Sequence, residues 1–182
     1  QNYNTTNSDW DIAAVRDGSS SPDLILFGAG NEKHPSVSGQ YVVYENWTDS
    51  DHSSVWRFNL TDNTSIPVFP SSDQETFPQV SADRIVWQAR NAADTRSQII
   101  VWENGGITRL TPRDVNQEKP ALYGNRIAVE DYRRNSNAPD VYVYEYASSW
   151  KEIWAAPNHF DAAQLTPAIW NNRIVWEDTR PG

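Results

Sequence analysis

The sequence predicts an all-β protein built from repeated antiparallel sheets. The first observation is a motif that occurs four times: a proline, an apolar residue two positions later and another seven positions after the proline. The second is the spacing of the copies, which is 43, 42 and 47 residues. The third is an apolar segment of strand length that follows each of the first three copies after a polar loop. Such a period is typical of stacked structural repeats. The prolines are Pro35, Pro78, Pro120 and Pro167.

Each copy of the motif predicts two strands joined by a tight turn. Gly, Asn and Asp at the turns favour the positive φ angles of two-residue hairpin loops. The second strand is almost continuously apolar in residues 84–87 and 173–176, which indicates a strand covered on both faces. We place the proline at the head of the first strand, where its missing N–H lies outside the ladder. The expected turns are Ser38–Gly39, Ala82–Asp83, Gly124–Asn125 and Asn171–Asn172.

Third strands are expected at residues 24–27, 55–58, 99–102 and 141–144, and shorter fourth strands at 66–69, 107–110 and 151–154. Pro67 marks the fourth strand as an outer edge, where a missing donor is tolerated. A unit of about 43 residues with four antiparallel strands is typical of a β-propeller blade. A sandwich would not repeat one motif at this period, and no long segment shows helical periodicity.

The chain is expected to form one propeller domain over residues 9–182, after a polar segment 1–8 that forms a tail or an exchanged arm. The repeats lie near 9–34, 35–77, 78–119, 120–166 and 167–182. The first repeat has no recognisable first strand and the last stops after a second strand. Three arrangements stay open: an irregular ring of four blades or an incomplete five, a piece of a longer propeller, or half blades completed by a neighbouring subunit.

Composition limits the function. The length of 182 residues suits one domain. The chain has 24 acidic and 15 basic side chains, and the resulting net charge of −9 argues against binding to nucleic acid or anionic membranes. The absence of cysteine excludes disulfides, thiolate metal sites and cysteine nucleophiles. No apolar run approaches the roughly 20 residues of a membrane-spanning helix.

The long loops, which join second to third and fourth to first strands, are expected on one face of the propeller. Binding residues concentrate on loops held by a rigid scaffold, so this face is the default contact surface, against the simpler alternative of a solvated rim of mixed charge. The candidate residues of this long-loop face are Asp17, Asp49, Asp51, Arg90, Asp94, Arg96, Asp131, Arg133, Arg134, Asp178 and Arg180.

One repeat position carries Glu45, Gln88, Glu130 and Glu177. A ring of carboxylates could hold Ca²⁺, but carboxylates at strand ends more often pair with a neighbouring blade, so we expect no cofactor. The histidines have no metal-ligand spacing, and neither a phosphate-binding loop nor a nucleophile elbow is present, so no catalytic residue is assigned. The arginines before the second strands are expected to bridge blades, and the strand tryptophans to fill the core between them.

Four N-glycosylation sequons lean towards a secreted glycoprotein, together with the acidic composition. Three of them cluster in one repeat. The candidate acceptors are Asn4, Asn46, Asn59 and Asn63.

The pattern Pro-x-Ile-x-x-x-Arg-Ile-Val-Trp-Glu-Asp at 167–178, with Asp-Val-Tyr-Val-Tyr at 140–144, resembles the TolB-like β-propeller repeats of bacterial envelope and archaeal cell-surface proteins. The resemblance covers residues 9–182. It implies protein–protein contact, envelope attachment or surface assembly, while the metal clusters and catalytic domains of related enzymes have no counterpart among these residues.

We therefore expect a non-catalytic module outside the cell or at its surface, with the periplasm as another location. It would act in structure, assembly or adhesion. Its partners would be envelope proteins or copies of itself joined head to tail into filaments through the terminal half blades. The alternatives are an enzyme acting on polysaccharide and a carbohydrate- or peptide-binding module that uses the long-loop face.

Overall fold

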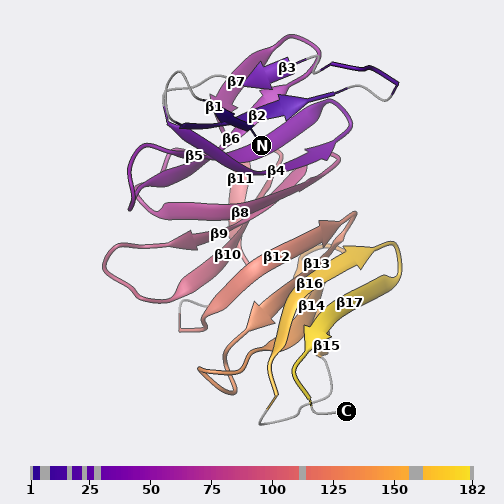
Figure 1. Ribbon diagram of the computed structural model, residues 1–182. Coiled ribbons are helices and arrows are strands. Elements are labelled where there is room, and N and C mark those ends of the chain that lie inside the picture. The colour runs from indigo at the N-terminus through magenta and orange to yellow at the C-terminus, as the bar shows by residue number, and fades with distance from the viewer. Residues whose placement is uncertain are drawn as a thin grey trace.

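The computed structural model describes residues 2–4, 9–15, 18–21, 24–26, 30–110, 114–155 and 162–180 (Figure 1). In these residues it contains seventeen strands and no helix. They form five antiparallel sheets. The sheets comprise β1 (Asn2–Asn4), β2 (Asp9–Ala14) and β3 (Leu24–Leu26); β4 (Asn31–Ser38), β5 (Tyr41–Trp47), β6 (Ser53–Asn59) and β7 (Thr64–Pro67); β8 (Gln74–Ser81), β9 (Arg84–Arg90), β10 (Ser97–Glu103) and β11 (Gly106–Arg109); β12 (Gln117–Tyr123), β13 (Arg126–Asp131), β14 (Asp140–Tyr146) and β15 (Trp150–Ala155); and β16 (Gln164–Trp170) and β17 (Arg173–Asp178).

The predicted fold class is confirmed, because three of the five sheets are four-stranded propeller blades and all five stack face to face along an arc. Each blade runs in chain order from its first to its fourth strand. Figure 1 shows the β1–β2–β3 sheet at one end of the arc and the β16–β17 sheet at the other. No described strand of one end sheet pairs with a strand of the other, so the part of the chain described does not close into a ring.

Two expectations about the N-terminal repeat need correction. Residues 2–4, expected in a tail or an exchanged arm, form β1 and pair with β2 of the same chain, Asn2 opposite Asp11 and Asn4 opposite Asp9. The first repeat therefore does have a strand in the first position. The apolar motif could not reveal it, because Asn2–Asn4 carries neither the proline nor the apolar spacing.

The position of the proline was also predicted wrongly. The first strands begin three or four residues before it, so the connections from the preceding blades are shorter than expected. The pairing register shifts around each proline, which marks a β-bulge. An unpaired bulge position tolerates the missing N–H of proline inside a strand. The residue before each proline, called the bulge residue below, has a positive φ: His34 48°, Phe77 53°, Lys119 47° and Thr166 48°.

The tight turns lie on the opposite face from the long loops, as expected. Three fall where predicted, but the turn placed at Ser38–Gly39 is Gly39–Gln40, because Ser38 pairs with Tyr41. Gly39 has a φ of 56°. Pro67 ends the exposed outer strand β7, in agreement with its edge assignment.

The hydrophobic core lies between consecutive blades. Val43 and Val55 of the second sheet pack with Ile85 and Trp87 of the third, and each remaining junction has its own cluster. The second strands β5, β9 and β13 are buried on both faces, as their apolar sequences predicted. Trp87 fills the core between blades, also as predicted.

A hydrogen bond from each of three bulge residues fastens one blade to the one before it. The bulge exposes a backbone N–H that no strand partner accepts, and an oxygen of the preceding blade accepts it instead. Glu45 Oε1 accepts from Phe77 N at 2.6 Å, Gln88 Oε1 from Lys119 N at 3.1 Å, and Glu130 Oε1 from Thr166 N at 2.7 Å. We call the position of Glu45, Gln88, Glu130 and Glu177 the capping position.

In a second set of buried side chains, two members make the reverse contact. The residue three positions before each proline is Glu32, Glu75, Gln117 or Gln164, and all four are buried. Glu75 Oε2 accepts from Val55 N of the preceding blade at 2.8 Å, and Gln164 Oε1 accepts from Val141 N at 3.0 Å. Reciprocal polar contacts therefore fix the relative height of adjacent blades, which apolar packing alone would leave free to slide.

We expect Glu130→Ala to lower the free energy of unfolding by about 2–4 kcal/mol, because it leaves the N–H of Thr166 and the ammonium of Lys119 without their buried acceptor. Urea unfolding followed by tryptophan fluorescence measures the change. Glu130→Gln should cost less, since Gln88 serves the same junction role. The matched control is Glu177→Ala at the exposed capping position, expected within about 0.5 kcal/mol of wild type. Equal losses at both positions would contradict the capping role.

Candidate interaction surfaces

Six of the predicted long-loop residues form three pairs that share one local geometry. In each, an aspartate accepts both the backbone N–H and the guanidinium of the arginine two residues later. Asp131 Oδ1 accepts from Arg133 N and Nε, both at 2.9 Å. The other pairs are Asp94 with Arg96 and Asp178 with Arg180. These hydrogen bonds between residues two positions apart shape the loops. The charges of these six side chains are therefore largely neutralised by one another.

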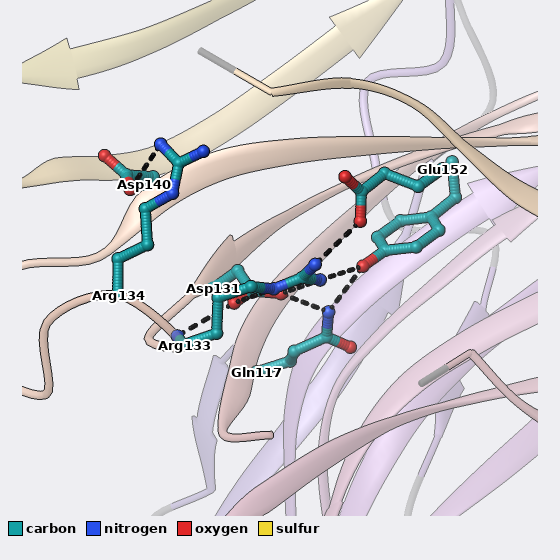
Figure 2. A network of polar contacts seen from close by, with 7 residues as sticks. Gln117, Asp131, Arg133, Arg134, Asp140 and Glu152 are labelled. Atoms are coloured by element: carbon teal, nitrogen blue, oxygen red, sulfur yellow. Dashed lines mark hydrogen bonds and ion pairs between the residues drawn. The ribbon is translucent and has the colours of Figure 1, made fainter. Parts of the chain in front are cut away.

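The Arg133 pair extends into a larger network (Figure 2). Arg133 also donates to Tyr144 Oη at 2.7 Å and to Glu152 at 2.9 Å, and Gln117 donates to Asp131 and to Tyr144 Oη. Burial opposes the charge of Arg133, but the hydrogen bonds and charge of Asp131 outweigh it and raise the pKa of the guanidinium. Burial raises the pKa of Tyr144 to about 12. The network ties β13, β14, β15 and the loop after β13 into one rigid unit.

The remaining long-loop candidates lie in separate places. Asp49 accepts from the backbone N–H groups of Asp51 and His52, and the first of these bonds contributes most to lowering its pKa. Arg90 donates to Gln74 at 2.8 Å. Arg134 lies 3.6 Å from Asp140. Asp51 is exposed, and Asp17 lies outside the described residues.

The capping carboxylates are satisfied at their own junctions rather than facing one shared ion. Glu45 accepts from His34 and Trp47 as well as from Phe77. In the part of the chain that the structure describes, no group of three or more His, Asp or Glu side chains is arranged to hold a metal ion.

Arg84 bridges blades as predicted, while Arg126 pairs within its own blade. Arg84 donates to the carbonyl of Gly124 in the next blade at 2.7 Å and lies over the rings of Tyr146 and Trp150. Arg126 binds Glu145 at 2.8 Å.

The sequon asparagines differ in accessibility. Asn63 is exposed in a turn. Asn59 donates to Asp62, and the side-chain oxygen of Asn46 is buried. The side chain of Asn4 lies outside what the structure describes.

A cluster of buried carboxylates was missed by the sequence analysis. Asp9, Asp11 and Glu32 are each at least nine-tenths buried, and each has an oxygen without a hydrogen-bond partner. Burial, and then the charges of Asp11 and Asp9, raise the pKa of Glu32 to about 7. The sequence contains a signal for this cluster, because the repeat position of Glu32 is occupied by a neutral glutamine in two other repeats, Gln117 and Gln164.

A cavity of about 420 Å³ lies on the third sheet, beside the loop that connects it to the second sheet. The loop between β7 and β8 forms one wall, and β9, β10, β11 and the loop after β9 form the others. Trp87 is among the residues that line it, although its indole Nε1 is itself buried. We call this space the Trp87 cavity.

The last sheet exposes one face that every complete blade buries. Strand alternation places Trp170, Val175 and Glu177 together on this terminal face, opposite Ile169, Ile174 and Trp176, which pack on the preceding blade. Val175 is 64% exposed, whereas Val43, Val86 and Ala128 at the same repeat position are each 0% exposed. Trp170 is 65% exposed. The terminal face therefore has the composition of an interface between blades.

Comparisons with known proteins confirm the propeller fold and the TolB-like resemblance. The β-propeller domain of the Trilobed protease from Pyrococcus furiosus, which has an open velcro topology, superposes with a TM-score of 0.59 at 16% identity over 89% of this chain and 54% of that one. A putative TolB from Agrobacterium tumefaciens gives 0.57 at 11% identity over 74% of this chain and 52% of that chain. TolB from Acinetobacter baumannii gives 0.52 at 13% over 93% and 50%.

These likenesses concern the fold, and the chain spans only about half the length of those three structures or domains. No protein-family model and no curated protein matches the sequence. Within the described residues, no helix has the length and apolar character needed to cross a membrane.

We expect Glu32→Gln to stabilise the protein above neutral pH. The pKa of Glu32 is about 7 in the native state, above its ordinary value of 4.5. Between pH 4.5 and pH 7 the native state therefore holds a proton on Glu32 that the unfolded state has lost. The contribution of Glu32 to stability therefore falls as pH rises through this window. Glutamine is neutral throughout, so the variant should gain on the order of 1–3 kcal/mol at pH 8 and little at pH 4.

Urea unfolding at both pH values provides the measurement. Glu75→Gln is the comparison, because hydrogen bonds from Val55 and Ser71 oppose the effect of burial on the Glu75 carboxylate. A loss of stability at pH 8 in Glu32→Gln would show that a charged Glu32 is needed.

Proposed function

We propose that the protein is a non-catalytic interaction module of the cell surface or extracellular space that assembles by stacking propeller blades end to end. One observation carries the proposal: the terminal face on β16–β17 exposes Val175 and Glu177, whose counterparts Val43 and Glu45, and Ala128 and Glu130, are buried at junctions within the chain. Its occupant would be the β1–β2–β3 sheet of a second copy.

The terminal face offers apolar surface, a polar anchor and a free strand edge. Burial of Trp170 and Val175 would each contribute about 1.5–3 kcal/mol before the cost of association. Glu177 occupies the capping position, so its carboxylate is placed to accept a backbone N–H from a docked sheet. The strand β17 pairs only with β16 in the described chain, so its other edge can add a strand.

The opposite end of the arc supplies a matching surface. Trp10 lies between Asp9 and Asp11, which face the second sheet, so strand alternation directs its side chain outward. Trp10 is 39% exposed. Because the two surfaces differ and lie at opposite ends, pairing between them is head to tail and can continue into a filament.

The location outside the cell is supported by the exposed sequon at Asn63 and by the acidic composition. A second candidate function, binding of carbohydrate or peptide on the long-loop face, is favoured by the Trp87 cavity.

We expect Val175→Asp to abolish concentration-dependent self-association, because a buried carboxylate at this position would lack a partner. Light scattering from 1 to 200 μM, with negative-stain microscopy, measures the assembly state. Val37→Asp is the matched control, since Val37 is 65% exposed on a first strand and should leave assembly unchanged. A wild-type protein that stays monomeric throughout, or equal assembly of wild type and Val175→Asp, would contradict the proposal.

A further inference from the structure

We propose that the free edge of β17 and the groove beside it bind an extended segment of a partner polypeptide that carries aromatic side chains at alternate positions. The groove lies between the fourth sheet and β17 and has a volume of about 310 Å³. We call it the β17 groove, and it is lined by Arg126, Val143, Ile153, Trp154, Ile174 and Trp176. Ile174 and Trp176 lie on the opposite side of β17 from the terminal face, so the proposal goes beyond the stacking of end sheets.

The β17 groove lies where a third strand packs at each earlier junction. Two side chains of that strand, separated by one residue, belong to the apolar cluster that joins its sheet to the preceding one. The pairs are Trp56 and Phe58 of β6, Ile100 and Trp102 of β10, and Tyr142 and Tyr144 of β14. Since β17 pairs only with β16, the third position of the last sheet is open in the part of the chain described.

Two residues of β17 show the effect of this open position. Ile174 and Trp176 pack on the fourth sheet but are only partly buried. Their counterparts at the earlier junctions are all buried: Val42, Ile85 and Ile127 for Ile174, and Tyr44, Trp87 and Val129 for Trp176. Trp154, on the facing wall of the groove, is 38% exposed. A strand beside β17 would cover the apolar surface that these three side chains leave open.

Arg126 gives an independent indication that the missing partner is aromatic. Its counterpart Arg84 pairs with a glutamate of its own sheet and also lies over the rings of Tyr146 and Trp150, which the next sheet contributes from its third and fourth strands. Arg126 makes the equivalent ion pair with Glu145, but no ring of the described residues lies over it. Because a guanidinium is attracted to the face of an aromatic ring, Arg126 favours an aromatic side chain in the groove.

The hollow at the equivalent place between the third and fourth sheets shows how a third strand completes such a groove. Its volume is about 230 Å³, and Tyr146 and Trp150 form part of its wall. In the β17 groove, the last sheet contributes only the second-strand residues Ile174 and Trp176. A third strand beside β17 would supply the missing part of the wall.

The fourth sheet also defines the register of the bound segment. The two tyrosines of β14 named above lie opposite Ile127 and Val129 of β13. A strand of the same kind beside β17 would place its rings opposite Ile174 and Trp176, within the groove. Backbone hydrogen bonds to the strand edge would provide affinity, and the contacts of alternate side chains would provide specificity.

A fluorescein-labelled synthetic peptide with the sequence of β14, residues 140–146, tests the site by fluorescence polarisation with the full chain. We expect saturable binding in the micromolar range. The same peptide with Tyr142→Ser and Tyr144→Ser should bind at least about tenfold more weakly, because aromatic anchors carry much of the energy of an interface. Hydrogen exchange of the β17 amides should slow when the unsubstituted peptide binds. No saturable binding, equal affinity of both peptides, or protection only outside β17 would overturn the proposal.

Ile153→Asp identifies the groove on the protein without altering the peptide. Ile153 is 47% exposed, and a carboxylate at this position would face the rings of the ligand, so Kd should rise at least about tenfold. Ile66→Asp is the matched control, since Ile66 is also 47% exposed on the outer strand of the second sheet, and it should leave Kd unchanged. Equal Kd values in Ile153→Asp and wild type would overturn the proposal.

The test is independent of assembly through the terminal face. Val175→Asp should bind the peptide as wild type does while losing self-association, because Val175 points away from the groove. Ile153→Asp should lose peptide binding and keep self-association. Self-association that disappears in Ile153→Asp, with no binding of the peptide to wild type, would assign the groove to a second copy of the chain and overturn the proposal.

Discussion

The structure depends on the hydrogen bond between the bulge residue of one blade and the capping position of the blade before it. A proline within a strand requires a bulge, and the bulge leaves a backbone N–H facing the neighbouring sheet. In a dry interface this group must find an acceptor. Glu45, Gln88 and Glu130 supply that acceptor at three consecutive junctions. The constraint explains why a proline and an acidic or amide residue recur together in this sequence.

Departures from the repeat are more informative than the repeat itself. Side chains that carry the architecture recur at each junction, as Val43, Val86 and Ala128 do in the core. Where Asp131 is replaced by Ala89, the buried Asp131–Arg133 pair of the fourth sheet has no counterpart in the third. Where Glu32 retains a charge that Gln117 and Gln164 lack, the first junction gains a titratable group near neutral pH. The repeats therefore provide internal controls for one another.

Much of the fold could be predicted from the sequence, because four copies of one motif define strand order, period and the buried second strands. The bulge could not, since proline at a strand head and proline at a bulge give the same local pattern, and only the pairing register separates them. β1 was missed because a three-residue strand without apolar spacing has no sequence signature. Among the site residues, the aspartates and arginines of the long loops were recognised but their pairing was not, because it depends on loop conformation. The Trp87 cavity required knowledge of which repeat positions face each other across a junction.

Assembly and ligand binding can operate in the same molecule because they use different surfaces. Stacking of end sheets would cover Trp170, Val175 and Trp10, all at the two ends of the arc. The Trp87 cavity lies on the third sheet, away from both end sheets, and is bounded by long loops, so a stacked neighbour would leave its mouth open. Each added copy would then bring one more identical cavity into the assembly. Such repetition would strengthen weak binding by one cavity towards a polymeric or surface-bound ligand, since linked sites raise the effective concentration of one another.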